Sequence, residues 1–156
     1  MNRFVWSVLC ARSIIDSETN NISLLNVIEQ ISVAEEPVEG GFIPGDFELV
    51  SFWTRNQDNQ PLRTRIRLIA FHPSGSELGV WEAMIDLSQH RRSRHRMKFS
   101  GMPADTPGTY LFVTQQWDDG RNNWKTESEI PLSVSFVPAP AEEGSETQDE
   151  AATVGP

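Results

Sequence analysis

The sequence is poor in the groups that build covalent scaffolds and membrane anchors. Cys10 is the only cysteine in 156 residues, so no internal disulfide bond can form and a disulfide-stapled scaffold is excluded. A lone cysteine in an apolar run is most often a buried, inert thiol, and it favours a reducing compartment, so we expect a cytoplasmic protein. No stretch approaches the roughly 18 apolar residues of a membrane span, so we expect no membrane partner.

The apolar run at the N-terminus is short. It follows Arg3 and ends at Cys10, whereas a signal peptide needs an apolar core of about 7–15 residues that ends in small residues. We therefore expect this run to be a strand of the folded domain.

Motifs of catalysis and metal binding are also missing. The chain has no Gly-x-Ser-x-Gly elbow, phosphate-cradling loop or His-Glu-x-x-His helix, and Cys10 has no Cys or His at metal-ligand spacing. Its three histidines, His72, His90 and His95, lie before a proline or beside arginines, and we interpret them as exposed turn residues. A triad assembled from distant residues stays an alternative, because geometry defines it. We predict no catalytic residue, no metal and no cofactor.

The formal net charge of −9 is unevenly distributed. Residues 138–156 contain five acids and no base, which leaves 17 acids against 13 bases in residues 1–137. A net negative body disfavours nucleic acid as a partner, since binding requires neutralised phosphates. Residues 138–156 also hold almost no large apolar side chain to offset the entropy of ordering. We predict one domain over residues 1–137 and a disordered acidic tail over 138–156.

Short runs rich in Val, Ile and aromatic residues alternate with clusters of turn residues, and no segment is convincingly helical. This pattern is typical of an all-β sandwich or barrel. The segment 22–33 also fits a helix in part, but its Val and Ile content favours a strand with a bulge near Asn26. The expected strands are residues 3–15, 22–33, 46–55, 63–71, 78–87, 91–100, 110–117 and 124–137.

The only tyrosine, Tyr110, follows the turn residues Pro107 and Gly108 and opens an apolar strand. In immunoglobulin-like sandwiches, a tyrosine at such a corner bonds through its hydroxyl to the backbone a few residues upstream. We predict an immunoglobulin-like antiparallel β-sandwich of about eight strands, with Tyr110 as the structural corner. The Cys…Trp…Cys spacing of antibody domains is absent, although Trp53 could serve as a core tryptophan.

Two expected strands carry basic residues at every second position, which places those side chains on one face. If both strands lay in one sheet, the seven cations would share a surface. Like charges directly opposite one another destabilise a sheet, so this surface would favour an anionic partner or the acidic tail. The predicted anion-binding residues are Arg63, Arg65 and Arg67 of the first ladder and Arg92, Arg94, Arg96 and Lys98 of the second.

The alternative is that both ladders are ordinary solvent-facing charges. Arginines on an outer face keep a sheet soluble, and charged edges prevent strand-to-strand aggregation. Acids on neighbouring strands would then pair with them, and such exposed pairs contribute little to stability. The candidate acids are Glu48, Glu82, Asp86, Glu127 and Glu129.

Two further groups of side chains carry alternatives. Trp117 and Trp124 flank the expected hairpin loop 118–123, where they form either a cross-strand pair or a binding tip. Several acids could converge on Ca²⁺ at one end of the sandwich, although no calcium-loop motif is present. Those acids are Glu35, Glu36, Glu39, Asp46, Asp118 and Asp119.

The order of turns and strands resembles a family. It comprises a strand and turn from Cys10 to Asn21, the run Ile-Ser-Leu-Leu-Asn-Val-Ile-Glu-Gln-Ile from Ile22, and a Pro-Ser-Gly turn at Pro73. The corner before Tyr110 and a closing Ile-Pro-Leu-Ser-Val follow. Over residues 4–137 this resembles an uncharacterised family of short bacterial β-sandwich proteins of unknown function. The resemblance implies a bacterial sandwich domain and supplies no catalytic residue.

These observations rank three functions. The first is a non-enzymatic protein-interaction or structural module, whose protein partner could be a second copy of the chain. The second is an anion- or small-ligand-binding domain that uses an arginine-rich sheet face. The third is an enzyme with a dispersed site, which the missing motifs disfavour.

Overall fold

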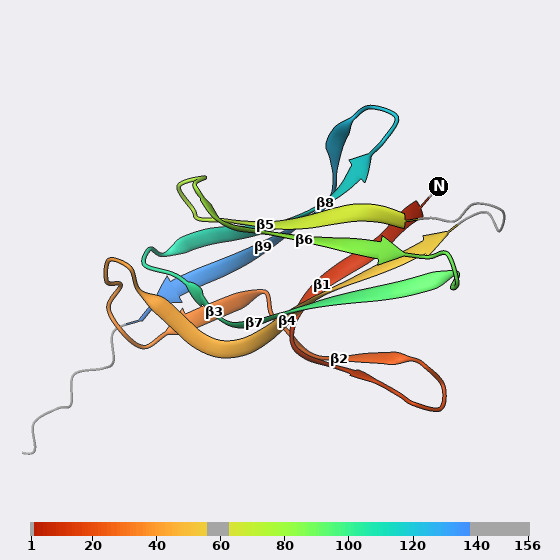
Figure 1. Cartoon of the computed structure of the whole chain (residues 1–156). Helices are drawn as coiled ribbons and strands as arrows, with labels where there is room; N and C mark the ends of the chain where they lie inside the picture. Colours follow the sequence, from red (N-terminus) through yellow and green to blue (C-terminus); the bar gives the residue numbers. More distant parts are fainter. Residues whose placement is uncertain (1, 56–62, 138–156) are drawn as a thin grey trace, which may run out of the picture.

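Two β-sheets packed face to face form the protein, shown one above the other in Figure 1. The computed structural model describes residues 2–55 and 63–137, and within them it contains nine strands and no helix, so none that could cross a membrane. The all-β sandwich predicted from the sequence is confirmed, while the tail predicted at 138–156 lies outside the described residues. The strands are β1 (Asn2–Ile15), β2 (Ile22–Val27), β3 (Gln30–Val33), β4 (Phe42–Arg55), β5 (Arg63–Phe71), β6 (Glu77–Asp86), β7 (Arg92–Pro103), β8 (Gly108–Asp118) and β9 (Asn123–Phe136).

The four-stranded sheet has the order β2-β1-β4-β7, and the five-stranded sheet has the order β3-β9-β8-β5-β6. All pairs are antiparallel except β3 with β9, which run parallel. Strands β5 and β7, which carry the two arginine ladders, therefore belong to different sheets.

The strand predicted for residues 22–33 is interrupted in the structure, where β2 and β3 lie in different sheets. Asn26 has a φ of 50°, in the left-handed region that asparagine tolerates better than most residues. The Ile28 N–H then donates to the Leu9 carbonyl oxygen at 2.8 Å before β3 joins β9. The bulge expected near Asn26 is thus a crossing between sheets, which raises the strand count to nine.

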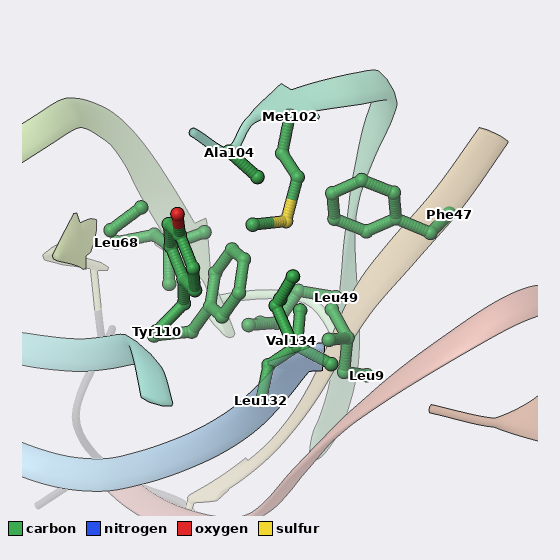
Figure 2. Close-up of a cluster of buried hydrophobic side chains, with 11 residues drawn as sticks. Leu9, Phe47, Leu49, Leu68, Met102, Ala104, Tyr110, Leu132 and Val134 are labelled. Carbon is green, nitrogen blue, oxygen red and sulfur yellow. The ribbon is translucent and has the colours of Figure 1, made fainter. Parts of the chain in front are cut away.

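The core lies between the sheets, where alternate side chains of each strand meet (Figure 2). Leu9, Leu49 and Leu132 are among its buried members, and fully burying a leucine stabilises the fold by about 1.5–3 kcal/mol. A second cluster surrounds Trp53, which is fully buried and meets Phe4 edge-to-face at 5.3 Å. Trp53 is therefore a core tryptophan.

The tyrosine corner is confirmed. The Tyr110 hydroxyl donates to the Thr106 carbonyl oxygen at 3.0 Å and accepts from the Thr106 N–H at 3.4 Å. Burial raises the pKa of Tyr110, so the hydroxyl keeps its proton. The side chain clamps the loop between β7 and β8 to the core.

The β1–β2 hairpin covers part of the outer face of the four-stranded sheet, a feature that the sequence pattern did not reveal. The pairing of β1 with β4 ends at Cys10, after which β1 continues with β2 alone. The hairpin turn reaches the far strand β7, where Arg94 donates to the Asn20 carbonyl oxygen at 2.5 Å. Cys10 and Val50 each follow a core residue along their strands, so their side chains point to the outer face of the sheet. Both are nevertheless fully buried. Burial and nearby Glu48 raise the pKa of the Cys10 thiol, as expected for an inert cysteine.

Candidate functional site

The two arginine ladders lie on the outer faces of opposite sheets. On β5, Thr64, Ile66 and Leu68 are buried, so the arginines between them face outward. On β7, the ladder residues stand opposite Glu48, Val50, Phe52 and Thr54 of β4, away from the core. The seven cations therefore do not form one surface, and each ladder has its own surroundings.

Two members of the β7 ladder, Arg96 and Lys98, form ion pairs with a carboxylate of the neighbouring strand. Arg96 donates to both carboxylate oxygens of Glu48 at 3.2 Å, and Lys98 lies 4.0 Å from the same carboxylate. The Ser13 hydroxyl also donates to Glu48, whose side chain is only 8% exposed. Burial alone would raise the pKa of Glu48, but hydrogen bonds from Arg96 and Ser13 and the charges of Arg96 and Lys98 outweigh it and lower the pKa. Glu48 is thus held ionised, and its predicted pairing with a ladder is confirmed.

The remaining β7 arginines differ from each other. The Arg94 guanidinium donates to two oxygens of Asn20 in the β1–β2 turn, the backbone carbonyl oxygen and the side-chain amide oxygen. Arg92 is exposed, and no carboxylate of the described residues lies within 4.0 Å of its guanidinium.

The β5 ladder begins with an ordinary surface pair. Arg63 donates through Nε to Asp86 of the neighbouring strand β6 at 2.8 Å, and both side chains are exposed. This pair is one of those expected from the solvent-facing alternative.

Arg65 and Arg67 are held differently, on the rings of two tryptophans. The Arg65 guanidinium lies 4.4 Å from the ring centroid of Trp117, and Arg67 lies 4.4 Å from that of Trp124. Both distances are within the range of a cation–π interaction. Arg67 also donates through Nε to the Gln115 amide oxygen at 2.7 Å. Among the described residues, neither guanidinium lies within 4.0 Å of a carboxylate. We call Arg65, Arg67, Trp117 and Trp124 the Arg–Trp cluster.

The two tryptophans are a cross-strand pair of β8 and β9, with ring centroids 5.3 Å apart at an angle of 74°. The structural alternative for them is therefore confirmed, and the pair also provides the surface on which the arginines lie. The sequence contained the signal, since both tryptophans flank one hairpin. It could not show that β5 lies beside β8 in a register that aligns the ladder with the pair.

The hairpin that bears this cluster extends beyond its neighbours. Pairing of β5 with β8 ends at Gln116, whereas β8 and β9 continue to the Asp118–Asn123 pair, and Figure 1 shows this end projecting from the sandwich. Asp118 accepts from the backbone N–H of Gly120 at 3.0 Å, which orders the turn. The cluster therefore lies at the base of a projecting, ordered hairpin.

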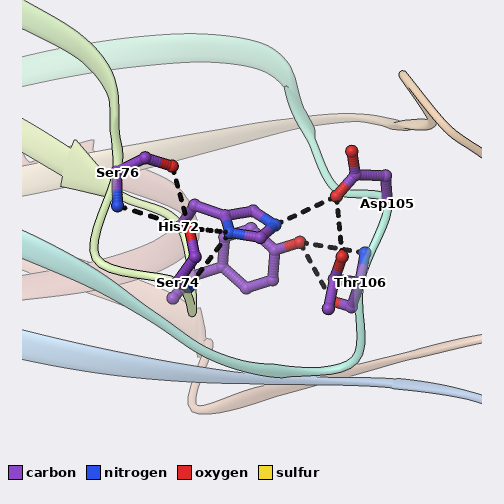
Figure 3. A network of polar contacts seen from close by, with 6 residues as sticks. His72, Ser74, Ser76, Asp105 and Thr106 are labelled. Atoms are coloured by element: carbon purple, nitrogen blue, oxygen red, sulfur yellow. Dashed lines mark hydrogen bonds and ion pairs between the residues drawn. The ribbon is translucent and has the colours of Figure 1, made fainter.

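A polar network surrounds His72 at the other end of the five-stranded sheet (Figure 3). Its Nε2 lies 3.0 Å from Asp105 Oδ1, and its Nδ1 lies 2.7 Å from Ser74 Oγ. Hydrogen bonds from His72 and Thr106 lower the pKa of Asp105. The His72 ring also packs edge-to-face on Tyr110 at 5.5 Å.

The Ser74–His72–Asp105 order resembles a catalytic triad, but its geometry favours a structural role. The Ser74 backbone N–H donates to His72 Nδ1 at 3.0 Å, so the nitrogen that would activate the hydroxyl already accepts a hydrogen bond. The network instead ties the turn after β5 to the tyrosine corner.

The interpretation of all three histidines as exposed turn residues is wrong for two of them. The His72 side chain is only 17% exposed, because it packs between two turns. His95 lies within β7 and alternates with the outward-facing arginines, and burial lowers its pKa. His90 is exposed in the loop before β7, as expected.

The calcium alternative is not supported, because its six acids do not come together. Among the described residues, which include all six, no group of three or more His, Cys, Asp or Glu side chains is placed to hold a metal ion. Asp118 is used in the hairpin turn, and the other acids are distributed over separate segments.

Comparison with known proteins adds no assignment. No protein-family model matches the chain, and no curated protein is significantly similar to it in sequence. The resemblance to a bacterial sandwich family therefore stays a prediction.

Proposed function

We propose that the protein is a non-enzymatic protein-interaction module that binds an acidic surface of a partner protein through the Arg–Trp cluster. The observation that supports this is the composition of the cluster: two guanidinium groups lie on tryptophan rings, and no carboxylate of the described residues is within 4.0 Å of either. Tryptophan and arginine are the residue types that most often dominate binding energy at protein interfaces.

The geometry supports binding because the side chains are already ordered. Stacking on Trp117 and Trp124 restrains Arg65 and Arg67, so less side-chain entropy is lost when a carboxylate pairs with them. Planar guanidinium groups can also bind carboxylates in a bidentate way. The surface thus combines apolar area with two oriented hydrogen-bond donors.

An external protein explains the site better than the chain's own tail does. The tail follows Val137, at the end of β9 opposite to Trp124, and a strand of this length spans about 40 Å. The first tail acid, Glu142, could lie at most about 18 Å beyond Val137, and the last, Glu150, at most about 45 Å. Only the last acids of a nearly extended tail would reach the cluster. A nucleic acid is disfavoured by the net charge of −9.

A cytoplasmic location and a bacterial source belong to the same proposal. The location is supported by the free, buried Cys10. The source is supported by the resemblance of the turn and strand order alone.

The test compares the wild-type protein with an Arg65→Glu/Arg67→Glu double variant and with Arg63→Glu as the matched control. Arg63 lies on the same face and strand but pairs with Asp86 instead of a tryptophan. Each protein is used as bait in native cell extract, and partners are quantified by mass spectrometry. We expect one acidic partner to be lost from the double variant and retained by the control.

Binding of the purified partner is then measured by calorimetry. We expect Trp124→Ala to weaken binding at least tenfold, and higher salt to weaken it further, because the interaction is electrostatic in part. Equal recovery of every partner by the double variant would contradict the proposal.

A further inference from the structure

We infer that a second site, on the opposite sheet, binds a small planar anion of the aromatic carboxylate type. The site is the cavity of about 280 Å³ between the β1–β2 turn and the outer face of the four-stranded sheet. This goes beyond the protein-interaction proposal, because it involves neither β5 nor the Arg–Trp cluster. The lining residues are Trp6, Asn21, Ile22, Phe52, Arg92 and Arg94.

Two aromatic rings form the apolar part of this cavity. Trp6 on β1 stands opposite Phe52 on β4, and Phe52 stands opposite Arg94 on β7, so the three side chains form one row across three strands. The rings of Trp6 and Phe52 are 5.6 Å apart with a tilt of 35°. Both side chains are half-buried, which leaves aromatic surface for a flat ligand ring to pack against.

The wall of the cavity is an ordered turn. The Asp16 carboxylate accepts from the backbone N–H groups of Glu18 and Thr19 at 2.9 and 2.6 Å and from the Thr19 hydroxyl at 2.9 Å. These bonds lower the pKa of Asp16, most strongly through Thr19, so the carboxylate that orders the turn stays ionised. Arg94 then ties the turn to the sheet through Asn20. A cavity held from both sides is preformed, which reduces the entropic cost of binding.

Two guanidinium groups supply the charge. Arg94 bonds to the carbonyl and amide oxygens of Asn20, which are neutral, and no carboxylate in the described part of the chain lies within 4.0 Å of its guanidinium. Arg92 has no carboxylate within 4.0 Å among the residues at 2–55 and 63–137. Both line the same cavity, so an anionic group that enters it gains charge-assisted hydrogen bonds.

The size of the cavity and the chemistry of its lining select the ligand. About 280 Å³ is near the lower limit for small-molecule sites and is enough for one or two rings. Aromatic rings beside guanidinium groups favour a molecule with a flat apolar body and one carboxylate.

The probe is 2-naphthoate, with the neutral 2-naphthylmethanol as its matched control, and binding is followed by calorimetry and amide chemical shifts. We expect saturable one-site binding of 2-naphthoate, shift changes at Ile22 and Phe52, and at least tenfold weaker binding of the alcohol. Arg92→Gln is expected to weaken 2-naphthoate binding at least tenfold. Arg63→Gln, a surface arginine on the other sheet, should leave it unchanged.

The spectrum of Arg92→Gln also reports whether the variant is folded, which is expected because Arg92 is exposed. Equal binding of acid and alcohol, or unchanged affinity in Arg92→Gln, would overturn the inference. So would 2-naphthoate shifts confined to the Arg–Trp cluster and abolished by Arg65→Gln/Arg67→Gln. That last result would leave the protein-interaction proposal standing, so the two can fail separately.

Discussion

The strands β5 and β7 carry the same sequence pattern, arginine at every second position, yet the structure uses the two ladders in different ways. On β7, Arg96 neutralises the buried Glu48 and Arg94 holds the β1–β2 turn. On β5, Arg65 and Arg67 lie on tryptophan rings at the protein surface. Two arginines of the β7 ladder thus stabilise the fold, and two arginines of the β5 ladder present charge at the surface.

The difference shows that alternation fixes the direction of a side chain and leaves its partner open. Both ladders project from the outer face of a sheet, as period-two patterning requires. The group that each arginine contacts depends on the neighbouring strand and on any segment that folds across that face of the sheet. The β1–β2 turn contacts the β7 ladder at Arg94, while the pair Trp117–Trp124 lies under Arg65 and Arg67 of the β5 ladder.

Arg96→Ala tests the structural ladder and should have the largest effect. It would leave the carboxylate of Glu48 buried without its main partner, and removal of one member of a buried pair is strongly destabilising. Arg96 is partly exposed, so we expect a loss of about 2–3 kcal/mol in the free energy of unfolding, measured by urea denaturation. The control is Arg92→Ala, expected within about 0.5 kcal/mol of the wild type. Equal losses of unfolding free energy in the two variants would show that Arg96 contributes no more to stability than the exposed Arg92.

Tyr110→Phe changes a residue that lies on neither ladder, so its effect on the free energy of unfolding is a reference for the others. It removes a hydroxyl that bonds to both the N–H and the carbonyl oxygen of Thr106, so we expect a loss of about 1 kcal/mol or more. The denaturation midpoint measures it, with the exposed Thr109→Ala as control. An unchanged midpoint would mean that Tyr110 acts only as a core aromatic.

The sequence predicted those features that depend on local patterns. Strand alternation, the turn at Asp16, the tyrosine corner and the tryptophan pair all follow from neighbouring residues, and the structure contains each of them. The break between Val27 and Gln30 was missed because a left-handed asparagine near a strand end and a bulge look the same in the sequence pattern.

The missed features depend on contacts between distant segments. The sheet membership of β5 and β7, the stacking of arginine on tryptophan and the half-buried His72 each require knowing which strands are neighbours. A single sequence gives the face of a strand and does not give its neighbours, so the candidate site could be predicted only as a set of outward cations.

The pH dependence of stability provides a further test of the β7 ladder. The pKa of Glu48 is lower in the folded than in the unfolded chain, so its stabilising contribution is present above the ordinary glutamate pKa. It is lost as the pH falls from that value through the folded pKa. The free energy of unfolding should therefore decrease less between pH 6 and pH 3 in Glu48→Gln than in the wild type. Parallel curves for the two proteins would show that the ion pair does not couple protonation to folding.

The smallest expected effect sharpens the contrast on β5 itself. A double-mutant cycle of Arg67→Ala and Trp124→Ala should give a coupling free energy of about 0.5–1 kcal/mol, because a partly desolvated cation–π contact is lost only once. The matching cycle of Arg63 with Asp86 should give no measurable coupling, since both side chains are exposed and screened by solvent. Both cycles are read from urea denaturation at one salt concentration. If the two cycles gave the same coupling, the tryptophans would not distinguish Arg67 from an ordinary surface arginine. The stacked arginines would then lose the preordering on which the proposed binding role depends.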